Sequence, residues 1–137
     1  MVVLDTDILT LLFAGHEKVQ RRIEQADDVR ITTISRFEIL RGRFDALLKA
    51  ANPKQLLEAA VRLAQSEQLL AEFAELGVEG AASRQFGLLQ TNRKLKKIGR
   101  ADLLIASVAL VNQATVVTRN LRHFQQVPGL KAENWAD

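Results

Sequence analysis

The stretch VVLDTD, from Val2 to Asp7, decides the fold that this sequence predicts. Its first three residues are apolar and two of them are β-branched, which is typical of a short strand buried on both faces of a parallel sheet. Asp5 then lies at the carboxyl end of that strand. Because ligands of open α/β sheets bind beyond the carboxyl ends of the strands, the Asp5 carboxylate is well placed to bind a metal ion or a substrate.

Asp7 has a simpler explanation than Asp5. Residues 8–14 are largely apolar and predict a helix, and aspartate is one of the residues preferred at a helix N-cap. We therefore expect Asp7 to cap this helix. A second acid just before the cap satisfies no obvious backbone group, so Asp5 is the stronger candidate for a functional role.

The composition is that of an ordinary globular protein, and the length fits one domain over residues 1–137. Of the 137 residues, 47% are hydrophobic and 26% are charged, which excludes wholesale disorder. The net charge of +3 favours an anionic partner such as nucleic acid. The absence of cysteine excludes disulfides, a thiolate zinc site and a thiol nucleophile.

Neither a targeting segment nor a membrane span is expected. The first strand begins at Val2, which leaves no room for a basic leader followed by an apolar signal run. No window approaches the roughly 18 consecutive apolar residues of a membrane-spanning helix. We therefore expect a cytoplasmic protein without a membrane partner.

Strand and helix patterns alternate along the rest of the chain, which predicts βαβ units and a mainly parallel sheet. We expect strands at residues 29–34, 73–76, 115–118 and 130–133. We expect helices at residues 16–26, 35–48, 81–97 and 101–111, and a further helix that begins at Asn52 and Pro53. The two helices on either side of Asn52 should form an αα-hairpin.

Glu38 can be explained in two ways. With Ser35 as the N-cap, Glu38 stands at the third helical position, and the two residues have the form of a capping box. Alternatively, Glu38 lies one helical turn beyond the end of the second strand, at the same rim of the sheet as Asp5. The residues around Glu38 favour the local cap when they are considered alone.

Two more polar sites follow later in the chain. Asp102 opens a helix so apolar that it should lie at the centre of the core, where a carboxylate needs a partner such as Arg100 or a shared divalent metal. Asn120 comes just after the strand at 115–118, again at a carboxyl end. Together with Asp5 and Glu38, these residues should meet in one crevice.

These segments together resemble the ordered motifs of PIN-domain ribonucleases, specifically the VapC-type toxins. The matching segments are LDTD at residues 4–7, ISRFEILRG at 34–42, IG and ADLLIA within 98–106, and VTRN at 117–120 with Phe124. Each segment alone is a weak signal, but four in this order and at this spacing are a strong one. The resemblance spans the chain from Val2 to about Trp135.

The resemblance implies a three-layer α/β/α sandwich that acts as an endoribonuclease. It implies Mg²⁺ or Mn²⁺ held by Asp5, Glu38 and Asp102. It also implies an RNA substrate, a homodimer and a VapB-type antitoxin that inhibits the enzyme. One departure concerns His123, because the family often has an acid at that position. This departure leaves open whether a fourth acidic ligand and a second tightly bound metal are present.

The residue types agree with this chemistry. Oxygen ligands without cysteine or a histidine cluster suit Mg²⁺ or Mn²⁺ better than zinc. Three carboxylates placed close together repel one another, and a divalent ion relieves that repulsion. We expect Asn120 to be a catalytic residue that orients the attacking water or the phosphate. His123 is either a donor to the substrate or an ordinary surface histidine.

A basic run from Arg93 to Arg100 carries five cations just before Asp102. Such a run is most often a solvated helix face, but its place beside the predicted crevice favours contacts with RNA phosphates. The residues predicted for this role are Lys94, Lys96, Lys97, Arg100 and Arg119. No aromatic residues interleave with them, so base stacking is not supported.

Apolar residues at 9–13 and 37–44 exceed what one helix face each can bury. Most of them should lie in the core. A remaining groove near Leu12, Phe37 and Phe44 is expected to receive a peptide or helix of the antitoxin.

Two other functions fit parts of the sequence. A phosphoacceptor receiver module also binds Mg²⁺ with acids at strand ends, but it requires a lysine after a late strand, where this chain has Arg119 and Asn120. A non-catalytic nucleic-acid-binding module would lack the acids that this chain retains. The ribonuclease interpretation therefore fits the sequence best.

Overall fold

Five short strands form one parallel sheet at the centre of the protein. The computed structural model describes all residues, 1–137. The strands are β1 (Val2–Leu4), β2 (Val29–Thr32), β3 (Ala74–Leu76), β4 (Thr115–Val117) and β5 (Lys131–Glu133). They lie in the order β3-β2-β1-β4-β5, and every neighbouring pair is parallel. The predicted parallel sheet is confirmed, including its two short outer strands.

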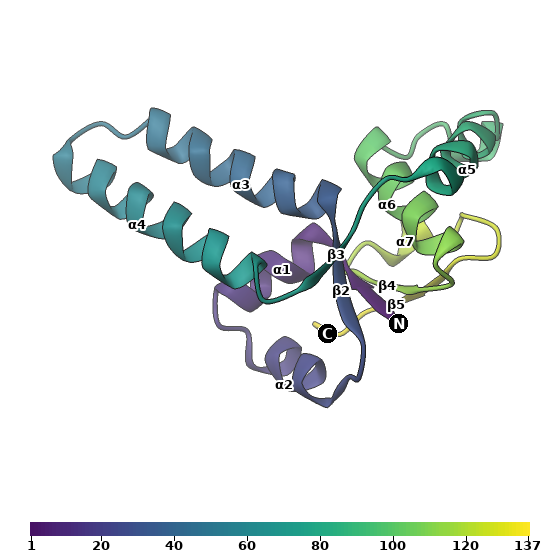
Figure 1. Ribbon diagram of the computed structural model, residues 1–137, viewed down its shortest axis with the longest axis horizontal. Helices are drawn as coiled ribbons and strands as arrows, with labels where there is room; N and C mark the ends of the chain where they lie inside the picture. Colours follow the sequence, from purple (N-terminus) through teal and green to yellow (C-terminus); the bar gives the residue numbers. More distant parts are fainter.

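Helices cover both faces of this sheet. They are α1 (Thr6–Phe13), α2 (Glu17–Gln25), α3 (Thr33–Leu48), α4 (Pro53–Leu70), α5 (Gly80–Gln90), α6 (Arg100–Val111) and α7 (Leu121–Phe124), with a 3₁₀ turn η1 (Arg93–Leu95). In Figure 1, α1 to α4 lie on one side of the sheet and α5 to α7 on the other. The predicted three-layer α/β/α sandwich is therefore confirmed.

Successive residues of β1 face the two helical layers. Val3 packs in one core with Ile105 of α6, and Leu4 packs in the other core with Ile8 of α1. All four side chains are completely buried. Because neighbouring residues of a strand point to opposite faces, a strand that is apolar at every position has to be covered on both sides. This requirement places β1 in the middle of the sheet.

Helices α3 and α4 form the predicted αα-hairpin, which projects from the body of the molecule (Figure 1). Asn52 begins α4 as predicted, because its Oδ1 accepts a hydrogen bond from the Gln55 N–H at 2.9 Å and Pro53 occupies the first helical position. Apolar side chains on the projecting part, such as Leu48 and Leu57, remain exposed. Although α4 has 18 residues, neither it nor any other helix is apolar enough to cross a membrane.

The predicted cap of the first helix is wrong. Helix α1 begins at Thr6, and its N-cap is Asp5, which has the extended backbone that an N-cap requires and accepts a hydrogen bond from the Thr6 N–H. Asp7 therefore lies inside the first turn and is not the cap. An acid at the end of a strand already has the conformation of an N-cap, so Asp5 takes this place before Asp7 can.

The capping box predicted at the start of α3 is also absent. Strand β2 ends at Thr32, two residues earlier than predicted, and Thr32 is the N-cap of α3. Its hydroxyl oxygen accepts a hydrogen bond from the Ser35 N–H at 3.1 Å. Ser35 consequently lies within the first turn, and Glu38 has no N-cap backbone group to bind there. The local explanation of Glu38 is therefore wrong.

The helix predicted at residues 81–97 ends at Gln90. Asn92 then begins the turn η1, where its Oδ1 accepts a hydrogen bond from the Lys94 N–H at 3.0 Å. An asparagine that binds nearby backbone groups in this way competes with helix continuation. Leu95 and Ile98 anchor the segment, because both are buried in the core beside α5 and α6. The first four cations of the basic run, at residues 93–97, therefore lie on a turn, and only Arg100 belongs to a helix, the first turn of α6.

Candidate active site

Asp5 is held from two sides at the carboxyl end of β1. Its Oδ1 accepts a hydrogen bond from the Thr6 N–H at 2.8 Å, and its Oδ2 accepts one from the Thr118 hydroxyl, also at 2.8 Å. Thr118 follows β4, the parallel neighbour of β1, so the two strands deliver the acid and its partner to the same edge. Asp5 is only 6% exposed, and both of its oxygens are fixed.

The surroundings of Asp5 disfavour its charged form. They raise its pKa to about 7, from an ordinary value of 3.8. Burial has the largest effect, followed by the negative charge of Asp7, while that of Asp102 adds a smaller increase. The hydrogen bonds from Thr118 and Thr6 lower the pKa and offset part of this shift. A cation beside Asp5 would favour the carboxylate, because it would offset the burial and the repulsion together.

Asp7 belongs to the same crevice, which the sequence analysis did not predict. Its Oδ2 accepts a hydrogen bond from the Arg119 N–H at 3.0 Å, whereas its Oδ1 is buried without a hydrogen-bond partner. Burial raises the pKa of Asp7, and the negative charge of Asp102 adds to that increase. The signal in the sequence was the pair of acids two residues apart. It was missed because Asp7 had been explained as a helix cap.

Glu38 reaches the same edge from α3. Its Oε1 accepts a hydrogen bond from the Thr6 hydroxyl at 2.7 Å. Thr6 directly follows Asp5 and also binds the Asp5 carboxylate through its backbone N–H. One residue therefore contacts both acids, although 32 positions separate Thr6 from Glu38. This arrangement agrees with the functional explanation of Glu38.

Asp102 lies in the first turn of α6, beside the loop that follows β4. Its Oδ2 is 3.6 Å from the His123 Nδ1, and the Asn120 side-chain nitrogen is 2.8 Å from the same ring atom. The backbone N–H of Asn120 donates to the Thr118 hydroxyl oxygen at 2.9 Å. The structure thus gathers the four predicted polar groups, together with His123, at one edge of the sheet.

The donor set of this crevice fits a hydrated divalent cation. No three of its aspartate, glutamate and histidine side chains form a group that could enclose a metal ion on their own. The crevice does offer several carboxylate oxygens, one of which, the Asp7 Oδ1, is buried and without a partner. Mg²⁺ usually keeps several waters and binds only a few carboxylates, so a complete protein cage is not required.

The cations predicted to bind RNA are all on the surface. The exposed residues are Lys94, Lys96, Lys97, Arg100 and Arg119. Arg100 lies over the ring of Phe86, with its guanidinium carbon 4.8 Å from the ring centroid. The Arg119 guanidinium is 3.8 Å from the Asp137 carboxylate, and both side chains are more than half exposed. The three lysines form no ion pair, so their charges are free to meet a phosphate.

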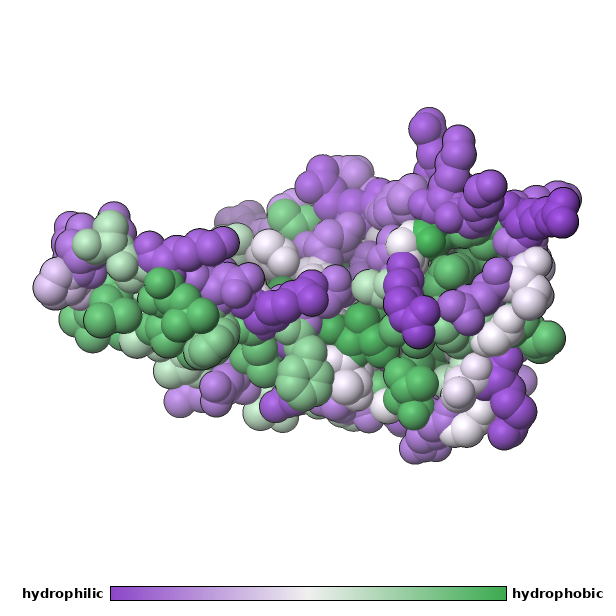
Figure 2. All heavy atoms as spheres, turned by 90° about the horizontal axis from the view of Figure 1, so that it is seen from above, coloured by the Kyte–Doolittle hydropathy of each residue, from purple (hydrophilic) through white to green (hydrophobic).

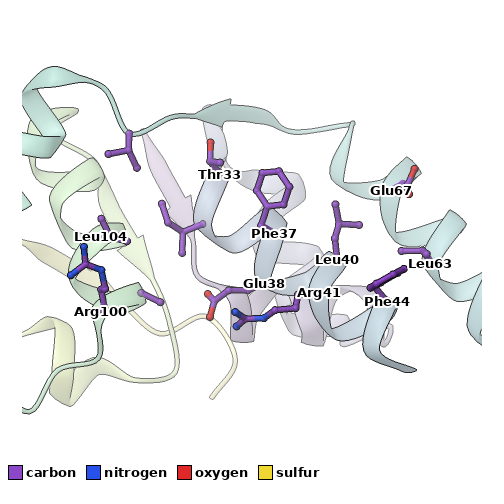
Figure 3. A pocket seen from close by; sticks show the side chains of 13 residues that line it. Thr33, Phe37, Glu38, Leu40, Arg41, Phe44, Leu63, Glu67, Arg100 and Leu104 are labelled. Carbon is purple, nitrogen blue, oxygen red and sulfur yellow. The ribbon is translucent and has the colours of Figure 1, made fainter. Parts of the chain in front are cut away.

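An apolar groove of about 830 Å³ adjoins the acidic crevice. It lies between α3, α4 and the start of α6, and its apolar lining includes Phe37, Leu40, Phe44, Leu63 and Leu104. Figure 3 shows Glu38, Arg41 and Arg100 along one edge of this groove. Because Glu38 also binds Thr6, it belongs to both the groove and the crevice.

The predicted groove is confirmed in part. Phe37 and Phe44 line it, and 57% and 49% of their surfaces are exposed. Leu12 does not line it, because this side chain packs against the core on the α1 side of the sheet. Figure 2 shows hydrophobic side chains along the projecting hairpin and toward the middle of the molecule. An apolar surface of this extent is typical of a site that binds a partner.

A parallel sheet with acidic side chains gathered beyond the carboxyl ends of its central strands defines an α/β protein with an acidic crevice at that edge. Residues 2–130 match the family described as PIN domain, and the chain therefore belongs to this family. The predicted resemblance is confirmed at this level. The receiver-like alternative is wrong, because the family match covers nearly the whole chain.

Named relatives point to one branch of that family. The chain is 46% identical over 52 residues to Ribonuclease VapC2 of Rickettsia felis, and the match covers 36% of this chain and 39% of the relative's length. Over its full length the chain is similar in structure to toxin-antitoxin proteins. One is VapBC2 of Rickettsia felis bound to a DNA fragment from their promoter, with a TM-score of 0.79, 26% identity and coverage of 98% of this chain and 99% of that chain.

Two further solved structures show the same similarity. DNA-bound VapBC from Salmonella typhimurium matches with a TM-score of 0.81 and 26% identity, over 98% of this chain and 99% of that chain. VapBC-1 from nontypeable Haemophilus influenzae matches with a TM-score of 0.76 and 25% identity, over the whole of both chains.

Proposed function

We propose that this protein is a metal-dependent endoribonuclease toxin of the VapC type, which a VapB-type antitoxin inhibits. The observation that carries the proposal is the crevice around the buried Asp5, whose carboxylate is repelled by Asp7 and Asp102, and where the Asp7 Oδ1 lacks a partner. Such a site is complete only when a cation offsets its charge. The similarity to Ribonuclease VapC2 supports RNA as the substrate.

Asp5, Glu38 and Asp102 would hold one Mg²⁺ or Mn²⁺ ion through their carboxylate oxygens. When bound, this ion supplies polarisation of the scissile phosphate and a lowered pKa of a bound water. Thr118 and the Thr6 N–H keep both oxygens of Asp5 in place. No reorganisation of this carboxylate is then needed when substrate binds.

Asn120 orients the attacking water or the phosphate in this proposal. Its side-chain amide is adjacent to His123 and its backbone binds Thr118, so the residue is fixed beside Asp102 from two directions. His123 occupies the place where related proteins often carry an acid, and it lies 3.6 Å from the Asp102 carboxylate. Because this position offers no fourth acidic ligand, we propose that the crevice binds one metal ion and not two.

The groove is the proposed antitoxin site. It is apolar along α3 and α4 and becomes polar at Glu38, next to the proposed metal ligands. A partner segment with apolar side chains and one arginine would fill the groove and pair with the acids.

We also propose that residues 1–137 form a single domain and that two copies of the protein form a homodimer. Because its substrate is cellular RNA, we place the protein in the cytoplasm.

The decisive experiment is incubation of the purified protein with an RNA pool in Mg²⁺, in Mn²⁺ and in EDTA. Cleavage at defined sites is expected with either metal, and complete loss is expected in EDTA because no protein group replaces the cation. Restoring Mg²⁺ should restore the same cleavage sites. Equal cleavage in EDTA would contradict the metal-dependent mechanism, and no cleavage under any condition would contradict the nuclease.

Replacing Lys94, Lys96 and Lys97 by alanine should weaken RNA binding and flatten its dependence on salt. Each lost phosphate contact reduces the slope of log K against log salt by about 0.7 on a single strand. All three lysines are exposed and unpaired, so the fold and the metal affinity should not change. A titration of RNA binding at several salt concentrations measures the slope. An unchanged slope would mean that these lysines are only a solvated surface.

A further inference from the structure

We propose that Thr6 is the positioning residue of the Glu38 carboxylate, which it holds at the crevice by a hydroxyl hydrogen bond that Ser35 supports. This inference rests on the proposed function and assigns a role to a residue that is not itself a metal ligand. It explains how an acid on a helix that starts at a different strand is kept beside Asp5.

Three oxygens carry the proposal. The Thr6 Oγ1 lies 2.7 Å from the Glu38 Oε1 and 3.1 Å from the Ser35 Oγ. Ser35 is completely buried, and the Glu38 carboxylate has no other hydrogen-bond partner within the protein. The carboxylate is therefore positioned by one short contact, and that contact depends on one hydroxyl group.

The number of protons fixes the direction of these bonds. A threonine hydroxyl has one proton, and an ionised carboxylate can only accept. Thr6 must therefore donate to Glu38, and its oxygen remains free to accept a proton from the Ser35 hydroxyl. Hydrogen bonds to a charged group are shorter and stronger than neutral ones, which agrees with the 2.7 Å distance to Glu38.

Thr6 also contacts Asp5 through a different group. Its backbone N–H donates to the Asp5 Oδ1 at 2.8 Å, while its side chain binds Glu38. The backbone contact caps α1 and does not depend on the hydroxyl group. A Thr6→Val variant would thus keep the helix cap and the shape of the side chain, and would lose only the bonds of the hydroxyl group to Glu38 and Ser35.

The experiment compares three variants of the full chain. Thr6→Val removes the hydroxyl, Thr6→Ser retains it, and Thr10→Val makes the same change on the exposed face of α1, where the Thr10 hydroxyl binds only the Thr6 carbonyl oxygen. The measurements are kcat and KM for RNA cleavage, Mn²⁺ affinity by electron paramagnetic resonance, and the melting temperature.

Thr6→Val should lower kcat and weaken Mn²⁺ binding by about tenfold to a hundredfold, the range expected for one hydrogen bond to a charged group. KM should change little, because the phosphate-binding cations are untouched. Thr6→Ser should restore most of the loss, and Thr10→Val should behave like the wild type in both measurements.

Three results would overturn the inference. They are unchanged kcat and Mn²⁺ affinity in Thr6→Val, an equal loss in Thr6→Ser, or a lower melting temperature as the only effect. Each of these can occur while the wild type cuts RNA normally, so the proposed function would survive. A wild-type protein that neither binds Mn²⁺ nor cuts RNA would instead contradict the proposed function and this inference together.

Discussion

Asp5→Asn is expected to leave the protein folded and to reduce RNA cleavage by roughly a thousandfold or more. A loss of rate of this size is typical when an essential catalytic group is removed. Asparagine has the same shape as aspartate, so its carbonyl oxygen can still accept the hydrogen bond from the Thr6 N–H and its amide nitrogen can instead donate to the Thr118 hydroxyl oxygen. It lacks the negative charge that a divalent cation requires. Glu38→Gln and Asp102→Asn should have the same effect if the three acids act as one site.

The same variant should change how stability depends on pH. In the apoprotein Asp5 has a pKa of about 7, against 3.8 as its ordinary value. Between these two pH values the native state binds more protons than the unfolded state, so the free energy of unfolding falls as pH rises. A shift of this size corresponds to a loss on the order of a few kcal/mol across the window.

Asparagine does not titrate, so Asp5→Asn should lack most of this decrease. The neighbouring charges that repel Asp5, those of Asp7 and Asp102, remain in the variant. Thermal or denaturant unfolding without metal, at pH values from about 4 to about 8, measures the difference. Asp28→Asn is the matched control, because Asp28 is an exposed acid that pairs with Arg30 at 3.0 Å away from the crevice.

Two results would count against this account of Asp5. The first is an Asp5→Asn variant that retains cleavage, which would remove Asp5 from the active site. The second is an identical pH dependence of stability in wild type and variant, which would mean that Asp5 is charged in the native apoprotein throughout this range. Saturating Mg²⁺ should reduce the wild-type decrease, because the cation binds the deprotonated carboxylate.

The sequence was sufficient to predict the features that depend on local pattern. The apolar run of β1 required cover on both faces, and Asn52 followed by Pro53 marked the start of α4 correctly. Placing Asp5 and Asp102 at one edge followed from the topology of a parallel sheet. These features depend on a few adjacent residues or on the order of the elements.

What could not be predicted depends on side chains that meet across the fold. The bond from Thr118 to Asp5 joins residues 113 positions apart, and it exists because β1 and β4 are neighbours in register. The cap assignments failed for a different reason. Asp5 and Asp7 are equally good N-cap residues by type, and only the exact end of the strand decides between them. Once Asp7 had been assigned as the cap, its place in the crevice was overlooked.

Phe37→Lys is expected to release the nuclease from its antitoxin while leaving RNA cleavage intact. Phe37 lies in the apolar groove and is 57% exposed, so its ring is available to a partner and contributes little to the core. A lysine in its place would leave a charge unpaired against the apolar residues of the antitoxin. Loss of an aromatic contact at the centre of an interface costs about 2 kcal/mol or more, which corresponds to roughly thirtyfold weaker inhibition.

The measurement is a titration of RNA cleavage with the cognate antitoxin, for the wild type and for two variants. Leu88→Lys is the matched control, because Leu88 is exposed to a similar degree, at 67%, but lies on α5 outside the groove. Phe37→Lys should need a much higher antitoxin concentration for half inhibition, and Leu88→Lys should need the same concentration as the wild type. Unchanged inhibition of Phe37→Lys would show that the antitoxin binds elsewhere. Equal release by both variants would show that an added positive charge, and not the groove, is responsible.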